Sequence, residues 1–263
     1  MIEFRNVTKS FNDEVVLNDI SFRIFRGETK VIMGVSGCGK STILKLILGL
    51  IRPDSGQIFV EGEDITRMTE QELASVRRKM GMVFQEGALF DSLSVRENVA
   101  YRLYEEGNAP DQEIEQIVER LLGFVGLEEA IDKMPAELSG GMKRRVGIAR
   151  ALVGTPRVIL YDEPTAGLDP ITKRTIVELM IKLRDVEGVT TVFVTHDLRA
   201  AGIMASEYAI AESDGNVRFA RGGDSLCLVN VHFVMLDEGM IRFEGRFEEL
   251  MSSDVPYIRR FVT

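Results

Sequence analysis

The sequence predicts an α/β fold with a mainly parallel core sheet, an N-terminal antiparallel β-subdomain and a helical subdomain in the middle of the chain. Three observations support this prediction. A glycine-rich loop lies between an apolar strand and an apolar helix, short β-branched runs recur later, and helical periodicity dominates between them. The 263 residues are enough for one large domain of this kind.

The first 60 residues indicate antiparallel strands. Apolar and polar residues alternate along residues 2–7, 21–25 and 57–60, and Gly27 and Gly56 lie between these runs. Strict alternation is typical of strands with one buried and one exposed face. We therefore expect an antiparallel sheet beside the core.

Residues 34–41 read Gly-Val-Ser-Gly-Cys-Gly-Lys-Ser, between a strand at 30–33 and a helix at 43–50. In this context backbone N–H groups and a helix N-terminus hold phosphates, Lys40 reaches the β- and γ-phosphates, and Ser41 contributes its hydroxyl to Mg²⁺. An ordinary glycine-rich turn would match by chance in roughly one chain in a hundred. We expect the nucleotide to contact Gly34, Val35, Ser36, Gly37, Cys38, Gly39, Lys40, Ser41 and Thr42.

Helical signals dominate from about residue 69 to residue 155. Thr69–Glu72 and Ser94–Glu97 have the spacing of capping boxes. After Asp111 the apolar residues follow one helix face, which is most simply a core-facing surface: Ile114, Ile117, Val118, Leu121, Leu122 and Val125.

Two continuous apolar runs, 158–161 and 191–194, predict parallel strands buried on both faces. A helical pattern at 171–184 separates them, which implies a right-handed crossover. The first run ends in Asp162 and Glu163, at the sheet edge where α/β proteins bind ligands. Asp162 would hold Mg²⁺ and Glu163 would polarise the attacking water. Alone the pair is a weak signal, because such dipeptides are common at strand ends.

A second glycine-rich helix start lies at Ser139, Gly140 and Gly141. Ser139 can cap the helix, and the two glycines let the backbone approach an anion closely. An N-cap without any ligand is the simpler interpretation of these residues taken alone.

The composition excludes several functions. A net charge of −9 argues against nucleic-acid binding. Two cysteines, Cys38 and Cys227, suit a reducing cytosol, and two histidines predict no structural zinc. Because no apolar run reaches the roughly 20 residues of a membrane span, we expect membrane contact only through partners.

Six motifs occur in the order found in ABC-transporter ATPases, and from about residue 2 to residue 208 the chain resembles that family: Gly34–Ser41, Gln85, Leu138–Gly141, Val158–Glu163, Ala166–Asp169 and His196. The resemblance implies a P-loop NTPase core with the β-subdomain at 1–85 and 156–210. It also implies a helical signature subdomain at 86–155, within a single nucleotide-binding domain of 1–263.

The resemblance also implies roles at ATP. Two copies would close head to tail, with each ATP between the phosphate loop of one and Ser139–Gly141 of the other. Gln85 would contact Mg²⁺ or the attacking water, His196 would bond the γ-phosphate, and Asp169 would line the nucleotide site. Phe11 would stack on adenine, although packing alone is an alternative for an isolated aromatic residue.

Residues 84–95, together with Met142, are similar to ATPase subunits of MCE-type phospholipid transporters, the Mla-like systems. This implies a multi-span permease, an MCE-type lipid-binding subunit, and a peripheral location on the cytoplasmic face of the inner membrane. Two alternatives stay open. One is an ABC ATPase for another cargo, such as an amino-acid importer, and the other is an ABC ATPase that is soluble and has no permease.

The C-terminal part shows a hairpin pattern twice, at 208–220 around Asp214-Gly215 and at 233–245. Because residues 247–251 suit a terminal helix, we assign 231–263 to the C-terminal hairpin and helix of the family. Residues 211–230 are then an insertion. The simplest interpretation is a surface elaboration without function, and the alternative is a hairpin that docks a partner or stabilises a dimer.

Overall fold

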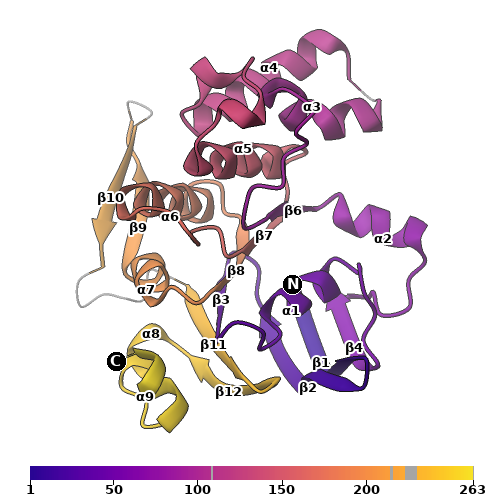
Figure 1. Cartoon of the computed structure of the whole chain (residues 1–263), viewed down its shortest axis with the longest axis vertical. Coiled ribbons are helices and arrows are strands. Elements are labelled where there is room, and N and C mark those ends of the chain that lie inside the picture. Colours follow the sequence, from indigo (N-terminus) through magenta and orange to yellow (C-terminus); the bar gives the residue numbers. More distant parts are fainter. Residues whose placement is uncertain (108, 214–215, 223–229, 263) are drawn as a thin grey trace.

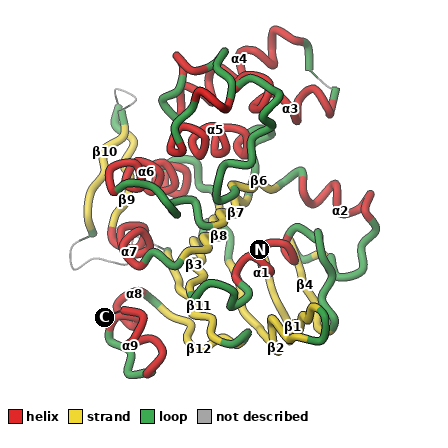
Figure 2. The backbone as a smooth tube through the Cα atoms, in the orientation of Figure 1, coloured by secondary structure: helices red, strands yellow, loops and turns green. Residues whose placement is uncertain are grey.

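The computed structural model describes residues 1–107, 109–213, 216–222 and 230–262. Figure 1 shows a core sheet that crosses the molecule, with the β-subdomain on one side and a group of helices above it. Figure 2 shows the same division between strand-rich and helix-rich regions. The Asp214-Gly215 turn and Cys227 lie outside the described residues.

The β-subdomain is an antiparallel sheet in the order β2-β1-β4-β5. Its strands are β1 (Ile2–Phe11), β2 (Glu14–Ile24), β4 (Ser55–Val60) and β5 (Glu63–Asp64). Ile2 and Phe4, two residues apart, are buried, and Val7 is buried after a register shift in the strand. This confirms the antiparallel sheet that the period-2 pattern predicts.

The core sheet has the order β12-β11-β3-β8-β7-β6, in which only β12 runs antiparallel to its neighbour. Its strands are β3 (Thr29–Met33), β6 (Met80–Val83), β7 (Val158–Asp162), β8 (Thr190–Thr195), β11 (Val231–Asp237) and β12 (Met240–Gly245). Parallel strands of one sheet end at the same edge, so the residues after β3, β6, β7 and β8 come together there.

The strand β6 lies in the part of the chain where helical signals dominate the sequence, and the sequence analysis did not predict it. Met80–Val83 is too short to show a period of its own, and it follows a helix after only two residues. Pairing with β7 places Val83 opposite Tyr161, and this tertiary pairing gives the segment its strand conformation.

Helices cover the core sheet and form the upper region in Figure 1. Those near the sheet are α1 (Lys40–Ile47), α2 (Glu70–Arg77), α6 (Pro170–Asp185) and α7 (Leu198–Ser206). The upper region holds α3 (Val95–Glu106), α4 (Asp111–Phe124), α5 (Gly140–Leu152) and the short 3₁₀ helices Glu128–Ala130 and Pro135–Glu137. Both predicted capping boxes form, at the starts of α2 and α3. No described helix is long and apolar enough to cross a membrane.

Strands β9 (Glu207–Ala211) and β10 (Val217–Arg221) pair only with each other among the described strands. Glu207, which is 2% exposed, fixes this hairpin to α6 by accepting hydrogen bonds from Arg174 at 2.5 and 2.9 Å. The chain ends in α8 (Phe247–Met251) and α9 (Pro256–Val262). The sequence predicted the first of these helices but not the second.

Candidate active site

The loop between β3 and α1 is held close to two other strands. A Cβ at Gly34 would lie 2.4 Å from the carbonyl oxygen of Leu236, at the end of β11. A Cβ at Gly39 would lie 2.9 Å from the carbonyl oxygen of Val16 in β2, and Gly39 has a φ of +104°. Both positions therefore require glycine, and the loop backbone is confined by its surroundings.

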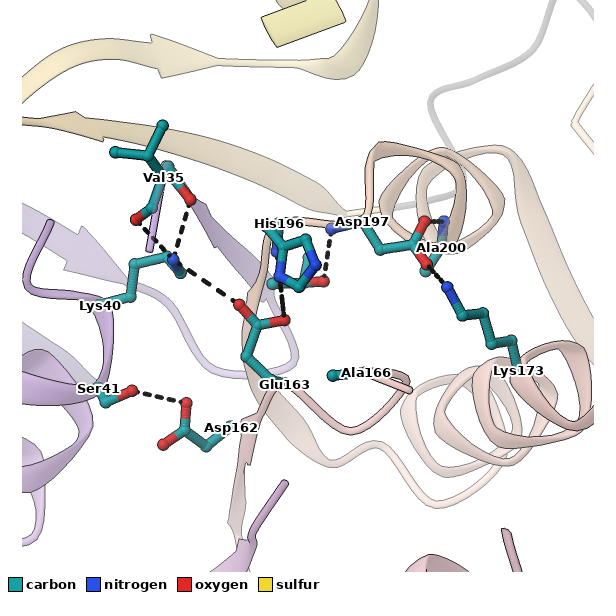
Figure 3. A network of polar contacts seen from close by, with 12 residues as sticks. Val35, Lys40, Ser41, Asp162, Glu163, Ala166, Lys173, His196, Asp197 and Ala200 are labelled. Carbon is teal, nitrogen blue, oxygen red and sulfur yellow. Dashed lines mark hydrogen bonds and ion pairs between the residues drawn. The ribbon is translucent and has the colours of Figure 1, made fainter. Parts of the chain in front are cut away.

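Lys40, the first residue of α1, turns its side chain back into this loop (Figure 3). Its Nζ donates to the carbonyl oxygens of Gly34 at 2.9 Å and Val35 at 3.0 Å, and lies 3.7 Å from Oε1 of Glu163. The side chain is 6% exposed. A buried ammonium held by two carbonyls in an anion-binding loop suits a phosphate group.

Ser41 and Asp162 meet across the start of α1 and the end of β7. Ser41 Oγ donates to Oδ1 of Asp162 at 2.8 Å. Burial raises the pKa of the Asp162 carboxyl, the neighbouring Glu163 adds to this effect, and the Ser41 hydrogen bond opposes it. A hydroxyl and a carboxylate are the hard oxygen donors that Mg²⁺ prefers, so the pair fits that ion.

Glu163 lies between a lysine and a histidine from two other elements. Its Oε2 is 2.9 Å from Nδ1 of His196, which follows β8 (Figure 3). Its backbone has a φ of +48°, a left-handed conformation that is uncommon for glutamate, and its N–H donates to Val194 O at 3.0 Å. Backbone strain at the end of a strand is typical of functional sites.

Two further predicted residues, Gln85 and Phe11, form no hydrogen bond or ion pair with Lys40 or Glu163 in the described chain. Gln85 is exposed and lies two residues beyond Val83, as Glu163 lies two beyond Tyr161 in the paired strand. Phe11 is 42% exposed at the end of β1, and the Lys9 ammonium lies 5.3 Å from its ring centroid. Both side chains are accessible to a ligand.

Ser139, Gly140 and Gly141 begin α5, away from the phosphate loop. Ser139 caps the helix by accepting a hydrogen bond from the Met142 N–H at 3.3 Å. A Cβ at Gly141 would lie 2.3 Å from Cγ2 of Thr172, so this glycine lets α5 pack against α6. Within the described chain, no hydrogen bond joins these residues to the phosphate loop.

Asp169 is the N-cap residue of α6. Its Oδ1 accepts from the N–H groups of Ile171 and Thr172, both at 3.0 Å, and so caps the helix. The same helix contributes Lys173, whose Nζ lies 2.6 Å from Asp197, the residue after His196. The segment after Glu163 and the segment after β8 are therefore connected.

Sequence reasoning missed two residues at this site. Arg144 of α5 is 6% exposed and donates to the carbonyl oxygen of Ala166, which links α5 to the loop after Glu163. Tyr257 of α9 contacts Val35 in the phosphate loop. Neither belongs to one of the six motifs, and Arg144 lies in a short basic run, 143–145, that does not by itself indicate a contact with the loop after Glu163.

This fold, with a phosphate loop, an Asp-Glu pair and a histidine at one sheet edge, defines an ATP-binding cassette. The sequence pattern of the ABC transporter family matches residues 17–166. The chain belongs to this family, as its ATP-binding and ATP-hydrolysing subunit.

Three proteins from different organisms are similar in sequence to this chain. It is 41% identical to the Haemophilus influenzae intermembrane phospholipid transport system ATP-binding protein MlaF, over 82% of each chain. It is 38% identical to the Arabidopsis thaliana chloroplastic protein TRIGALACTOSYLDIACYLGLYCEROL 3, over 100% of this chain and 73% of the relative. It is 42% identical to the methionine import ATP-binding protein MetN of Carboxydothermus hydrogenoformans, over 75% of this chain but only 58% of that relative.

A solved structure has the same fold. A dimeric ATP-binding cassette in a post-hydrolysis state, bound to ADP and Pi, matches with a TM-score of 0.77 and 31% identity. The match covers 94% of this chain and 98% of the other. This confirms the P-loop NTPase architecture that the motifs indicate.

Proposed function

We propose that this chain powers a membrane transporter that moves phospholipid, and that it does so as a pair of copies which close around ATP. The observation that carries the cargo assignment is the segment 84–95 with Met142, which is similar to the Mla-like ATPases. The identity to MlaF over 82% of the chain supports it.

At the phosphates, we assign binding to the loop of residues 34–42 and to Lys40. The Lys40 ammonium, which two carbonyl oxygens already orient in the loop, would add charge stabilisation for the γ-phosphate. Ser41, Asp162 and Gln85 would hold Mg²⁺, which when bound supplies charge neutralisation at the phosphates. Phe11 would stack on adenine, and Asp169 would shape the loop that lines the site.

At the reacting water, we assign the base-like role to Glu163. Its two oxygens are engaged in different directions, one toward Lys40 and one toward His196. His196 is about half exposed, so its ring can turn to bond the γ-phosphate once a nucleotide is bound. Phosphoryl transfer depends mostly on positioning and charge stabilisation, and this arrangement supports both.

For partners, we propose a second copy and a permease. Ser139 and Gly140 are exposed at the start of α5, Gly141 is buried, and none of the three has a hydrogen bond to the phosphate loop in the described chain. This separation is consistent with action on the nucleotide of another copy, where the positive helix terminus would face the γ-phosphate. The dimeric state of the related cassette also supports pairing.

The permease would dock on an aromatic patch, which we define as Phe90, Tyr101 and Tyr104. All three side chains are at least 40% exposed, the rings of Phe90 and Tyr101 lie 4.6 Å apart, and Tyr104 follows Tyr101 by three residues on the same face of α3. An exposed apolar patch of this kind is typical of a protein–protein contact.

The segment that carries this patch is firmly held. Asn98, which is fully buried, donates to the carbonyl oxygens of Phe90, Leu93 and Ser94 and accepts from the Phe90 N–H. Arg150 donates to Gly87 O and Ala88 O, both at 2.8 Å. A docking surface fixed to α3 and α5, directly after Gln85, could transmit movement between permease and nucleotide site. We also propose that the transporter includes an MCE-type lipid-binding subunit and that this chain lies at the cytoplasmic face of the inner membrane.

The docking test changes Phe90→Ser and Tyr101→Ser together and measures recovery of the chain with membranes from cells that contain its permease. We expect recovery to fall at least several-fold while ATP affinity stays near parental. The matched control is Met251→Ser, which removes an equally exposed apolar side chain from α8. Full recovery of the double variant with membranes would contradict docking at this patch.

A second candidate cargo is methionine, favoured by the 42% identity to MetN. The reconstituted complex separates the two. ATP-dependent transfer of a fluorescent phospholipid between vesicles, without uptake of labelled methionine, is the result expected for a lipid transporter. Methionine uptake without lipid transfer would contradict the phospholipid assignment.

A further inference from the structure

Helix α9 contacts the phosphate loop through one hydroxyl. The Val35 N–H donates to the Tyr257 hydroxyl oxygen at 3.2 Å, and that hydroxyl donates its own proton to Leu236 O at 2.9 Å. Tyr257 therefore joins the loop to the end of β11. A phenol has an ordinary pKa of about 10 and is protonated near neutral pH, and burial raises the pKa of the Tyr257 phenol further.

The loop contact has a geometric consequence. Gly34 C=O and Val35 N–H belong to the same peptide group, and in a trans peptide they point in opposite directions. Lys40 Nζ donates to the oxygen of this group at 2.9 Å, and Tyr257 accepts from its nitrogen. The peptide is thus held at both ends, by α1 on one side and by α9 on the other.

This peptide is one that could otherwise rotate. A flip of the peptide changes ψ of Gly34 and φ of Val35, and Gly34, which has no side chain, resists its part of this change only weakly. A flip would turn the carbonyl away from Lys40 and remove one of the two loop carbonyls that hold the ammonium. Tyr257 opposes that flip, since the flip would also break its bond to Val35.

Helix α9 is well placed to hold the hydroxyl steady. Ile258 is fully buried, and the Tyr257 and Phe261 rings lie 6.4 Å apart, with Phe261 packed against the core. The backbone of β11, which supplies the acceptor Leu236 O, also lies beside Gly34. Tyr257 therefore connects α9 and β11 with the loop that we expect to bind the phosphates.

We propose that Tyr257 is a positioning residue for the ATPase reaction, which orients the Gly34–Val35 peptide so that Lys40 is preorganised for the ATP phosphates. It acts through the loop and Lys40, without contact with the nucleotide. The C-terminal helix is then part of the nucleotide site, although it lies after every sequence motif.

The test is Tyr257→Phe in the full chain, which keeps the ring and its packing and removes only the hydroxyl. We expect KM for ATP to rise roughly 2- to 10-fold, the range of one net hydrogen bond, while kcat at saturating ATP stays near parental. The matched control is Tyr208→Phe in β9, away from the site, for which we expect parental KM. A lower kcat with an unchanged KM would indicate a purely structural role and overturn the proposal.

A double-mutant cycle tests the route through Lys40. ATP binding is measured for the parent, Tyr257→Phe, Lys40→Met and the double variant. Because Tyr257 acts through Lys40, its substitution should weaken binding in the parent and have little further effect once Lys40 is replaced. An equal weakening in both backgrounds would overturn the route through Lys40.

Discussion

Glu163 is the residue in which most of the site's constraints meet. Its backbone is in a left-handed conformation, one carboxylate oxygen is 3.7 Å from Lys40 Nζ, and the other is 2.9 Å from His196 Nδ1. A glutamate in a strained conformation, with partners on α1 and at the end of β8, points to a functional role for its geometry. The proposed function makes that purpose the alignment of a water with the γ-phosphate.

Replacement of Glu163 by glutamine separates binding from turnover. The amide keeps the shape but lacks the charge that polarises water, so kcat should fall by roughly 10²-fold or more while ATP binding persists. Steady-state kinetics and equilibrium binding measure the two effects. Glu187→Gln, at an exposed position before β8, is the matched control. Hydrolysis at the parental rate by Glu163→Gln would show that another group performs this role.

At Asp162 we expect the stability of the folded chain and the binding of Mg²⁺ to make opposite demands on the side chain. Its pKa in the folded protein is raised by burial, so its ionised form is less favourable in the folded chain than in the unfolded one. The protonated carboxyl therefore contributes stability at pH values below the pKa that Asp162 has in the unfolded chain. This stability is lost as the pH rises through the pKa that Asp162 has in the folded chain.

Asp162→Asn should therefore raise the unfolding midpoint of the nucleotide-free protein at neutral pH, and this gain should shrink as pH falls toward the unfolded pKa of aspartate, about 4. The same change should weaken Mg²⁺-dependent ATP hydrolysis. Thermal unfolding between pH 4 and pH 8 measures the first effect. A gain that grows as the pH falls would contradict the sign of the pKa shift.

At the scale of elements, the contact between α5 and α6 gives Gly141 two competing explanations. Its missing side chain makes room for Thr172, and the proposed function also places its backbone near the nucleotide of a partner copy. Gly141→Ala should lower the free energy of unfolding by about 1–3 kcal/mol, because its Cβ would overlap the threonine methyl group.

A second substitution separates the two explanations. Thr172→Ser removes the methyl group that the new Cβ would meet, so the double variant Gly141→Ala/Thr172→Ser should regain most of the lost stability. If the glycine also serves the nucleotide, ATPase activity of the double variant should stay low. Full recovery of both stability and activity would leave only the packing explanation. Thr172→Ser alone is the control.

The hairpin β9–β10 permits a separate test at this scale. Glu207 and its partner Arg174 fix β9 to α6, whereas β10 pairs only with β9 among the described strands. Replacing residues 211–230 by a short Gly/Ser linker should leave ATP affinity near parental, because β3, α1 and β7 keep their neighbours. Loss of ATP binding would contradict the interpretation of these residues as an insertion, and loss of permease binding alone would indicate a docking role.

The elements that sequence reasoning found are those with strong local signals. The phosphate loop, the two capping boxes and the buried strands β7 and β8 each have a pattern that a few residues determine. Strand β6 and helix α9 were missed because both are short and depend on tertiary contacts, as the pairing of Val83 with Tyr161 shows.

The same distinction holds for the active site. Lys40, Ser41, Asp162, Glu163 and His196 were predicted from motifs, and the structure brings their side chains together. The contacts of Arg144 and Tyr257 could not be predicted, because each joins segments that are far apart in the sequence. Their roles, like those of Gln85, Phe11 and Asp169 at the nucleotide, stay predictions.

At the scale of the whole molecule, one copy of the chain has a complete phosphate loop but keeps Ser139 at a separate helix end. The central claim is that two copies close so that each supplies what the other lacks. Two composite sites would then form per dimer, and each would need Lys40 from one copy and Ser139 from the other.

The most direct measurement mixes a Lys40→Ala subunit with a Ser139→Arg subunit and follows ATP hydrolysis. Each variant alone damages both sites of its homodimer, whereas the mixed dimer keeps one site with intact Lys40 and Ser139. We predict measurable ATPase activity in the mixture and almost none in either variant alone. No activity in heterodimers that are shown to have formed would contradict the account, and would indicate a site completed within one chain.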